Sequence, residues 1–325
     1  ISAIAFLKSG IDPKLKYNDY TGYYQIGNWK WRAWKRGGHG ATDMKKSLVE
    51  SVNTYYYKFS DQIGYAPIVK TARDFGLGNI TGIDVSGEKK GIIPDPDWKK
   101  KRTKTVWYRG DTILLSIGQG FTLVTPIQLA KAYTFLANKG WAYEPHVVSR
   151  IEDVQTGKTE TVVTQKTVLT DYPASFYETI NDALIATVDQ NNGTTRIMKN
   201  PYVKVAAKSG SAQNPHSKLT HAWVAGYFPA DKEPEVVFVC LLEGAGGGGV
   251  MAGGMAKRFL DKYLEVEKGI VPVQNTPHIE PKITNSTIQT SGEQENESSG
   301  EGVGEERENE ERETEETSTS EGEQN

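Results

Sequence analysis

The chain has 325 residues and a mass of 35.9 kDa, with 37% hydrophobic and 24% charged residues. This length suits one large domain or two medium ones with a packed core. A mean hydropathy of −0.54, without any apolar run of about 18 residues, excludes a bundle of membrane helices.

In the N-terminal half, a first helix is expected to end before Gly10 and Pro13. A second helix is expected to begin at Asp43, a residue type that suits the N-cap. Two stretches rich in glycine and lysine are expected to be loops, the later one with short strands: residues 17–40 and 80–111. A buried apolar run follows at residues 112–117. The helices that the spacing predicts here span residues 2–9, 43–63 and 66–75.

In the C-terminal half, Thr125 caps a helix that has Pro126 at its first position. This helix is expected to run to Gly140, with further helices over residues 172–189 and 252–265. Apolar segments predict strands at residues 146–151, 160–168, 202–208, 221–228 and 235–242. Because the last three are joined by short polar connections, they are expected to pair antiparallel. Helices around such a sheet indicate an α+β (mixed α/β) fold.

The formal charge of −3 is unevenly distributed along the chain. Residues 280–325 carry 15 acidic and three basic side chains, a net charge of −12, whereas residues 1–279 carry 35 basic and 26 acidic, a net charge of +9. No aromatic residue follows residue 279. Such a composition buries too little apolar surface to offset chain entropy. We therefore expect a folded basic domain over residues 1–271 and a disordered acidic tail over residues 272–325.

One polar tripeptide closes a strand-like segment: Lys208, Ser209 and Gly210 are followed by Ser211. Alternation along a strand would put the two serines on one face, with a glycine gap between them where a ligand backbone can approach. The lysine would supply positive potential, which suits a ligand carboxylate. The tripeptide can also be a polar strand end with a turn glycine and no function. For the tripeptide taken alone, this non-functional interpretation is the stronger of the two.

Other candidates are weak individually. Ser51 and Asn53, two apart in the second helical segment, indicate either a proton relay with an amide contact or a helix break. His39 lies between glycines and suits a loop hydrogen bond better than a metal or base role. Cys240, the only cysteine, excludes a disulfide framework and lies in an apolar strand. Aromatic and basic residues alternate over residues 29–36, which favours a half-buried strand or loop over nucleic-acid binding.

Taken in order, these pieces resemble a known family. Ser51 with Asn53, and Lys208 with Ser209 and Gly210, match the second and third signatures of penicillin-recognising serine acyltransferases. The longer blocks over residues 34–58, 107–140, 205–213 and 221–229 resemble the penicillin-binding protein 2 family of class B peptidoglycan transpeptidases. The similarity covers roughly residues 1–264.

The resemblance implies a penicillin-binding transpeptidase or serine β-lactamase-like fold and a DD-transpeptidase activity on acyl-D-Ala-D-Ala stem peptides. Ser51 would relay protons near the leaving group, and Asn53 would bind the substrate amide. Lys208 would support Ser51 electrostatically. Ser209 and Ser211 would hold the terminal carboxylate beside Gly210, and the backbone N–H of Ser211 would serve the oxyanion hole.

The first signature of the family, a nucleophilic serine three residues before a lysine base, is not at its expected place. The family pattern would put it just ahead of Ile1, so we expect a domain truncated at its N-terminal side and inactive alone. The only such pair in the chain, Ser86 and Lys89, lies in a polar glycine-rich loop without the burial that a base needs.

The family also implies a context for the domain. We expect no cofactor and no metal: some relatives hold zinc, but here two of the ligand positions are Ala33 and Val52. Expected partners are peptidoglycan stem peptides, β-lactams and the membrane glycan polymerase of cell elongation, and not nucleic acid. We expect an inner-membrane protein with this domain on the periplasmic side. The alternatives are a D-Ala-D-Ala carboxypeptidase, a class D β-lactamase-like hydrolase and a non-catalytic β-lactam or peptidoglycan sensor.

Overall fold

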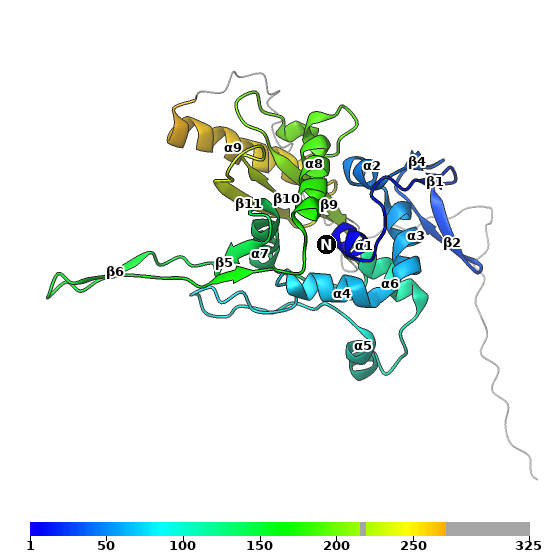
Figure 1. Cartoon of the computed structure of the whole chain (residues 1–325), viewed down its shortest axis with the longest axis horizontal. Coiled ribbons are helices and arrows are strands. Elements are labelled where there is room, and N and C mark those ends of the chain that lie inside the picture. The colour runs from blue at the N-terminus through cyan, green and yellow to red at the C-terminus, as the bar shows by residue number, and fades with distance from the viewer. Residues whose placement is uncertain (215–218, 271–325) are drawn as a thin grey trace, which may run out of the picture. The chain divides into compact units, whose positions relative to one another are not determined.

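The computed structural model describes residues 1–214 and 219–270 (Figure 1). Its helices are α1 (Ser2–Lys8), α2 (Met44–Val49), α3 (Asn53–Ile63), α4 (Tyr65–Asp74), α5 (Pro96–Thr103), α6 (Arg109–Ser116), α7 (Pro126–Ala137), α8 (Ala174–Asp189), the 3-10 helix η1 (Arg196–Met198) and α9 (Met251–Lys268). No helix within these ranges is both long and apolar enough to cross a bilayer. The predicted tail, residues 272–325, lies outside the described residues.

The strands form one three-stranded sheet and several two-stranded pairs. The paired strands are β1 (Tyr17–Asp19) with β4 (Gly40–Thr42), β2 (Tyr23–Ile26) with β3 (Trp29–Arg32), β5 (Trp141–Tyr143) with β8 (Lys166–Val168), and β6 (Arg150–Glu152) with β7 (Thr159–Thr161). The main sheet has the order β11-β10-β9, built from β9 (Ala206–Ala212), β10 (His221–Phe228) and β11 (Val236–Leu242).

The main sheet is antiparallel throughout, as its short connections predicted. Lys208 lies opposite Ala225, and Phe228 lies opposite Val236. The first strand of the main sheet was predicted at residues 202–208, but the structure has it at Ala206–Ala212, as β9. The apolar alternation ends at Ala207, but the backbone ladder that defines a strand does not require apolar side chains. The Lys-Ser-Gly motif is therefore inside an edge strand and not at its end.

Helices cover both faces of this sheet. Ala222 and Val224 of β10 pack with Leu260 of α9 in one hydrophobic cluster. Tyr227, from the opposite face, belongs with Phe135 of α7 to a larger cluster. This arrangement confirms the α+β architecture, with a sheet between helical layers.

The larger cluster surrounds α1, at the centre of the helical part (Figure 1). Five consecutive residues of α1 are buried: Ala3, Ile4, Ala5, Phe6 and Leu7. A helix that is apolar all round belongs in a core. It packs on α3, α4 and α8, which places it next to the helix that follows Ser51.

Several predicted elements are confirmed with small shifts. Thr125 caps α7: its Oγ1 accepts from Gln128 N at 3.3 Å, and Gln128 Oε1 accepts from Thr125 N at 3.0 Å. The helices predicted at residues 2–9, 66–75, 172–189 and 252–265 correspond to α1, α4, α8 and α9. The apolar run at residues 112–117 lies largely in α6.

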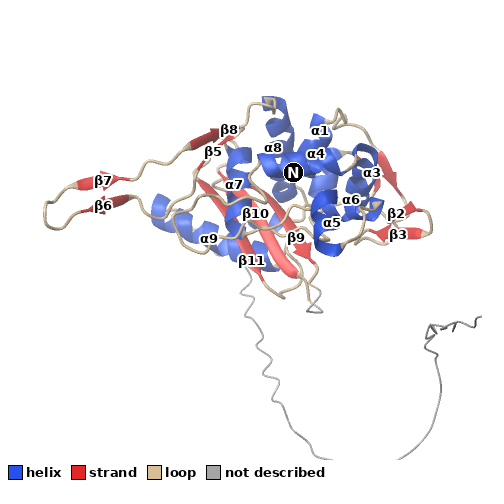
Figure 2. Cartoon of the chain, turned by 90° about the horizontal axis from the view of Figure 1, so that it is seen from below, coloured by secondary structure: helices blue, strands red, loops and turns tan. Residues whose placement is uncertain are grey.

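Three predictions are wrong over part of their length. The first predicted loop, residues 17–40, contains the β2–β3 hairpin, and the turn of this hairpin includes Gly27 at φ +57°. The second contains α5, with Asp95 as N-cap accepting from Trp98 N at 2.8 Å and Pro96 at the first position. In place of the strands predicted at residues 146–151 and 160–168, the structure has the three-residue strands β6, β7 and β8. Strands β6 and β7 form an arm that extends away from the core (Figures 1 and 2).

Candidate functional site

Ser51 lies in a tight break between α2 and α3, so the predicted continuous helix over residues 43–63 is wrong at this point. Ser51 has φ +55°, a left-handed conformation that costs a non-glycine residue about 1–3 kcal/mol. Val52 N donates to Ser47 O at 2.9 Å and closes the turn. The predicted N-cap is confirmed, since Asp43 Oδ1 accepts from Lys46 N at 2.9 Å. The break lifts the Ser51 side chain out of the helical register.

A buried histidine–aspartate hydrogen bond and a tryptophan support this break from one side. Trp34 Nε1 donates to the carbonyl oxygens of Glu50 and Ser51, at 3.2 Å each. The Trp34 ring packs edge-on against His39, with centroids 5.3 Å apart. His39 Nδ1 lies 3.0 Å from Asp19 Oδ2, and neither of these two side chains is exposed. His39 is thus a loop hydrogen-bond partner, as its setting between glycines favoured.

Lys208 reaches the break from the edge strand β9. The Lys208 Nζ lies 2.9 Å from Ser51 Oγ and 2.7 Å from Ser209 O. Lys208 and Ser51 are 157 positions apart in the sequence. Burial lowers the pKa of Lys208 to about 8. Because the Ser51 oxygen accepts from the ammonium group, its own hydrogen is free to point to a third partner. The pair can therefore pass a proton.

The remaining motif residues follow Lys208 along β9. The strand turns Ser209 and Ser211 to the side of α9, opposite Lys208. Ser211 Oγ accepts from Gly248 N at 3.1 Å, and Gln119 Nε2 donates to Ser211 O at 3.4 Å. Gly210 is exposed, and a Cβ there would meet only Trp223 Cβ at 3.6 Å. Packing does not demand a glycine at this position, which leaves room for a ligand.

Asn53 is the first residue of α3, two positions after Ser51. Its side chain hydrogen-bonds to Tyr57, which lowers the pKa of that phenol, while burial, the larger effect, raises it. The hydrogen bonds of Lys208 in the described ranges go to Ser51 and Ser209 and not to Asn53. The structure thus brings Ser51, Lys208 and Ser209 into contact and leaves Asn53 at the margin of the group.

The sequence motifs missed a glycine-rich loop under β9. A Cβ at Gly248 would lie 2.0 Å from Gly210 O and 2.7 Å from Trp223 O, so only glycine fits. Gly249 is similarly tight against Thr194 O, at 2.3 Å. The run of four glycines at residues 246–249 was a visible signal of close backbone approach.

The residues do not fit the zinc site of some relatives. Ala33 and Val52 carry no ligand atom, and Val52 is buried in the core. Where the structure describes the chain, no group of three His, Cys, Asp or Glu side chains is placed to hold a metal. Cys240 is half-buried against the sheet–α9 cluster. The Ser86 loop is exposed, and Glu88 in it binds Thr81.

Comparison with known proteins gives consistent results. A family model described as "Penicillin binding protein transpeptidase domain" matches residues 1–262. The peptidoglycan D,D-transpeptidase MrdA of Haemophilus influenzae is 36% identical over 296 residues, covering 84% of this chain and 45% of the relative. MrdA of Escherichia coli K12 is 31% identical over 280 residues, covering 81% and 44%. The chain therefore spans less than half the length of these curated relatives.

Solved structures of the same kind share the fold. Penicillin-binding protein 2 of Pseudomonas aeruginosa, in complex with WCK 5153, has a TM-score of 0.72 and 30% identity, covering 84% of this chain and 61% of that one. The Helicobacter pylori protein, in complex with MreC, also has a TM-score of 0.72, with 27% identity, covering 82% and 48%. With the match over residues 1–262, this chain belongs to the penicillin-binding protein transpeptidase family.

Proposed function

We propose that this chain is part of a peptidoglycan DD-transpeptidase that cross-links acyl-D-Ala-D-Ala stem peptides during cell elongation. The observation that carries the proposal is the 2.9 Å contact between Lys208 Nζ and Ser51 Oγ, made within a chain of this family. The contact joins the second and third family signatures, which are 157 positions apart, into one proton-transfer pair beside the free edge of β9.

The reaction begins on a serine that lies ahead of Ile1, with its lysine base. The serine oxygen attacks the carbonyl carbon of the penultimate D-alanine, and the peptide bond to the terminal D-alanine breaks. Ser51 gives its hydrogen to the leaving nitrogen and is reprotonated by Lys208. A lysine with a pKa of about 8 exchanges protons near neutral pH far more readily than one with the usual value. An acceptor amine then attacks the ester and releases the serine.

The strand β9 binds the donor peptide in this proposal. Ser209 and Ser211 hold the terminal carboxylate, and Gly210 lets the peptide backbone come close. The backbone N–H of Ser211 donates to the developing oxyanion, an interaction worth about 3 kcal/mol in comparable sites. Asn53 binds the substrate amide. The exposure of Gly210 and Ser211 supports this placement.

The relatives support a proposal for the setting of the domain. We propose that the complete protein is anchored in the inner membrane with this domain on the periplasmic side, and that β-lactams acylate it. One similar structure, 27% identical with a TM-score of 0.70, is described as a peptidoglycan synthase complex coordinating polymerisation and crosslinking. A membrane glycan polymerase is the corresponding partner here.

Labelling with a fluorescent penicillin tests the proposal. The 325-residue chain should remain unlabelled, whereas the polypeptide that includes the residues encoded ahead of Ile1 should form a covalent adduct. Lys208→Gln in the longer polypeptide should slow acylation at least tenfold, because the proton pair is lost. Labelling of the 325-residue chain would overturn the upstream nucleophile, and an unlabelled longer polypeptide would overturn the enzyme.

Product analysis separates the transpeptidase from its hydrolytic alternatives. With a soluble D-Ala-D-Ala peptide, the longer polypeptide should form a cross-linked product when an amine acceptor is added. A carboxypeptidase or a β-lactamase would release only the hydrolysed acid at every acceptor concentration. A sensor would form the penicillin adduct without turning over the peptide.

A further inference from the structure

The arm of β6 and β7 lies outside the core and outside the proposed active site (Figure 2). Every residue of its two strands, Arg150–Glu152 and Thr159–Thr161, is exposed. The root of the arm is fixed by the carboxylate of Asp84, which accepts from Val147 N at 2.8 Å and from Val148 N at 2.9 Å. A two-stranded hairpin that buries no apolar face is marginally stable in water. A further strand on one of its edges would therefore stabilise the arm.

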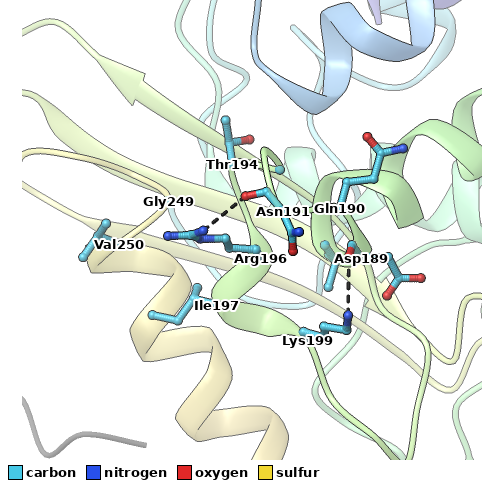
Figure 3. A pocket seen from close by; sticks show the side chains of 11 residues that line it. Asp189, Gln190, Asn191, Thr194, Arg196, Ile197, Lys199, Gly249 and Val250 are labelled. Atoms are coloured by element: carbon cyan, nitrogen blue, oxygen red, sulfur yellow. Dashed lines mark hydrogen bonds between the residues drawn. The ribbon is translucent and has the colours of Figure 1, made fainter.

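The arm is separate from the two pockets found in the described residues. The pocket in Figure 3, of about 490 Å³, is lined by residues from the end of α8, from η1 and from the start of α9, such as Asp189, Arg196 and Val250. The other pocket is lined by residues of α4 and α5. Neither lining includes a residue of β6, β7 or the turn between them. The arm thus offers a partner a backbone edge and not a ligand cavity.

The outer edge of β6 presents the backbone of Arg150 and Glu152. In the described residues β6 pairs with β7 alone. Val162 N donates to Ser149 O at 3.1 Å, so the backbone of Ser149 faces β7. Backbone groups alternate in direction along an antiparallel strand, and Ile151 therefore also faces β7. The N–H and C=O groups of Arg150 and Glu152 face away from β7 and are placed to bind another strand.

This edge is complementary to itself. When two copies place their β6 edges antiparallel about a two-fold axis at Ile151, each Arg150 lies opposite Glu152 of the second copy. Each of these opposed pairs exchanges two backbone hydrogen bonds, because the groups that face outward belong to the same two residues. Ile151 meets its own copy at a position without hydrogen bonds, where side chains come closest. Opposite charges and apolar pairs across strands are both stabilising.

The outer edge of β7 lacks this complementarity. Its outward backbone groups belong to Thr159 and Thr161, so the equivalent two-fold pairing would be centred on Glu160. Each Glu160 would then lie opposite its own copy, and like charges directly opposite are destabilising. The charges of β6 also disfavour pairing with an unrelated apolar strand. A second copy of this chain is therefore the partner that suits β6.

We propose that two copies of this chain associate through their β6 edges and form a four-stranded antiparallel sheet in the order β7-β6-β6-β7. This association goes beyond the proposed catalytic function and does not depend on it. The shared surface is small, because each copy contributes a strand of three residues. The dimer is therefore weak and forms as the protein concentration rises.

Sedimentation velocity of the 325-residue chain, from about 10 µM to about 1 mM, tests for the dimer. We expect a shift from monomer to dimer with concentration. Glu152→Arg places arginine opposite arginine in both pairs, and Arg150→Glu places glutamate opposite glutamate. Each substitution should weaken the association at least tenfold. A chain that stays monomeric over this range, or variants that associate as well as the unmodified chain, would overturn the proposal.

A mixture of the two variants tests the charge pairing itself. Glu152→Arg has only arginine at the paired positions and Arg150→Glu has only glutamate, so each repels itself and matches the other. The mixture should recover association close to that of the unmodified chain. The matched control is Glu265→Arg, the same charge change at an exposed position of α9, which should leave the association unchanged. A mixture that stays monomeric, or a control that dissociates like Glu152→Arg, contradicts the pairing.

Disulfide formation tests which edge is used. In Ile151→Cys the new thiol faces its own copy across the axis, where Cα atoms about 4.5 Å apart suit a disulfide. Glu160→Cys is the matched control, because Glu160 lies beside Ile151 on β7. Both substitutions are made together with Cys240→Ser, which removes the natural thiol. Mild oxidation should cross-link the first variant and not the second. Preferential cross-linking of the second, or of neither, overturns pairing through β6.

Discussion

The ammonium of Lys208 is held between two neutral oxygens, Ser51 Oγ and Ser209 O. No ion pair of this lysine occurs in the described residues, so no opposite charge offsets the loss of solvent, and its pKa falls to about 8. A group with that pKa is neutral in roughly a tenth of molecules at pH 7. This single residue therefore sets the pH range in which the proton pair can work.

The substitution Ser51→Ala should lower the pKa of Lys208 further, below about 8. The hydroxyl oxygen stabilises the charged form, and its removal leaves the desolvation unchanged. Titration of the Lys208 side chain by NMR measures this directly. Ser209→Ala is the control: Lys208 contacts the backbone oxygen of Ser209, so its pKa should stay near 8. A value near 10.5 in the unmodified chain, or no change in Ser51→Ala, would contradict the geometry.

The contact of Ser51 with Lys208 could be anticipated only from the resemblance to a family. No local pattern brings residues 157 positions apart together. Trp34 was missed for a related reason: its role is to donate to Glu50 O and Ser51 O, and a backbone acceptor leaves no trace in sequence.

At the scale of elements, sequence patterns located helices well and their interruptions poorly. The periodicity that predicted one helix over residues 43–63 continues across Ser51, because α2 and α3 both bury apolar side chains in the same cluster. The break follows from tertiary contacts that offset a left-handed residue. By contrast, α5 carried a readable signal that was overlooked, the N-cap Asp95 followed by Pro96.

The glycine-rich loop offers a test of how β9 is supported. In Gly248→Ala, the Cβ would overlap Gly210 O at 2.0 Å, so the loop must move away from the strand and the hydrogen bond from Gly248 N to Ser211 Oγ is lost. We expect a loss of about 2–3 kcal/mol in unfolding free energy, as for other overpacked sites. Urea denaturation with a fluorescence readout measures it.

Gly247→Ala is the matched control for this experiment. A Cβ at Gly247 meets no atom within 4 Å, and its backbone is not in the left-handed region. The variant should unfold within about 0.5 kcal/mol of the unmodified chain. Equal losses in the two variants would show that the loop tolerates no side chain at all, and that the close approach of Gly248 to β9 is not the cause.

At the scale of the whole molecule, two hydrophobic clusters meet at the main sheet, and the proposed site lies along its free edge. The larger cluster contains α1 and the helix α3 that begins beside Ser51. The smaller one joins α9 to the other face of the sheet. Order at the site therefore depends on packing far from it, because Ser51 is held at the junction of two core helices and Lys208 on a strand with helices on both faces.

Phe6→Ala tests this dependence. Phe6 is fully buried in α1, and its ring lies 5.9 Å from that of Phe59 and 6.4 Å from that of Tyr55, both on α3. The cavity should cost about 3–5 kcal/mol of unfolding free energy. Because α3 starts at Asn53, its loosening should also admit water around Ser51 and raise the pKa of Lys208 from about 8 toward the usual 10.5.

Phe259→Ala removes the same ring from α9, where Phe259 is 49% exposed, and should cost no more than about 1 kcal/mol. Chemical denaturation gives the two stabilities, and NMR titration gives the pKa of Lys208 in each variant. If Phe6→Ala is strongly destabilised but leaves that pKa at its original value, the site is insulated from the helical core. In that case the β9 edge, and not α3, sets the environment of the lysine.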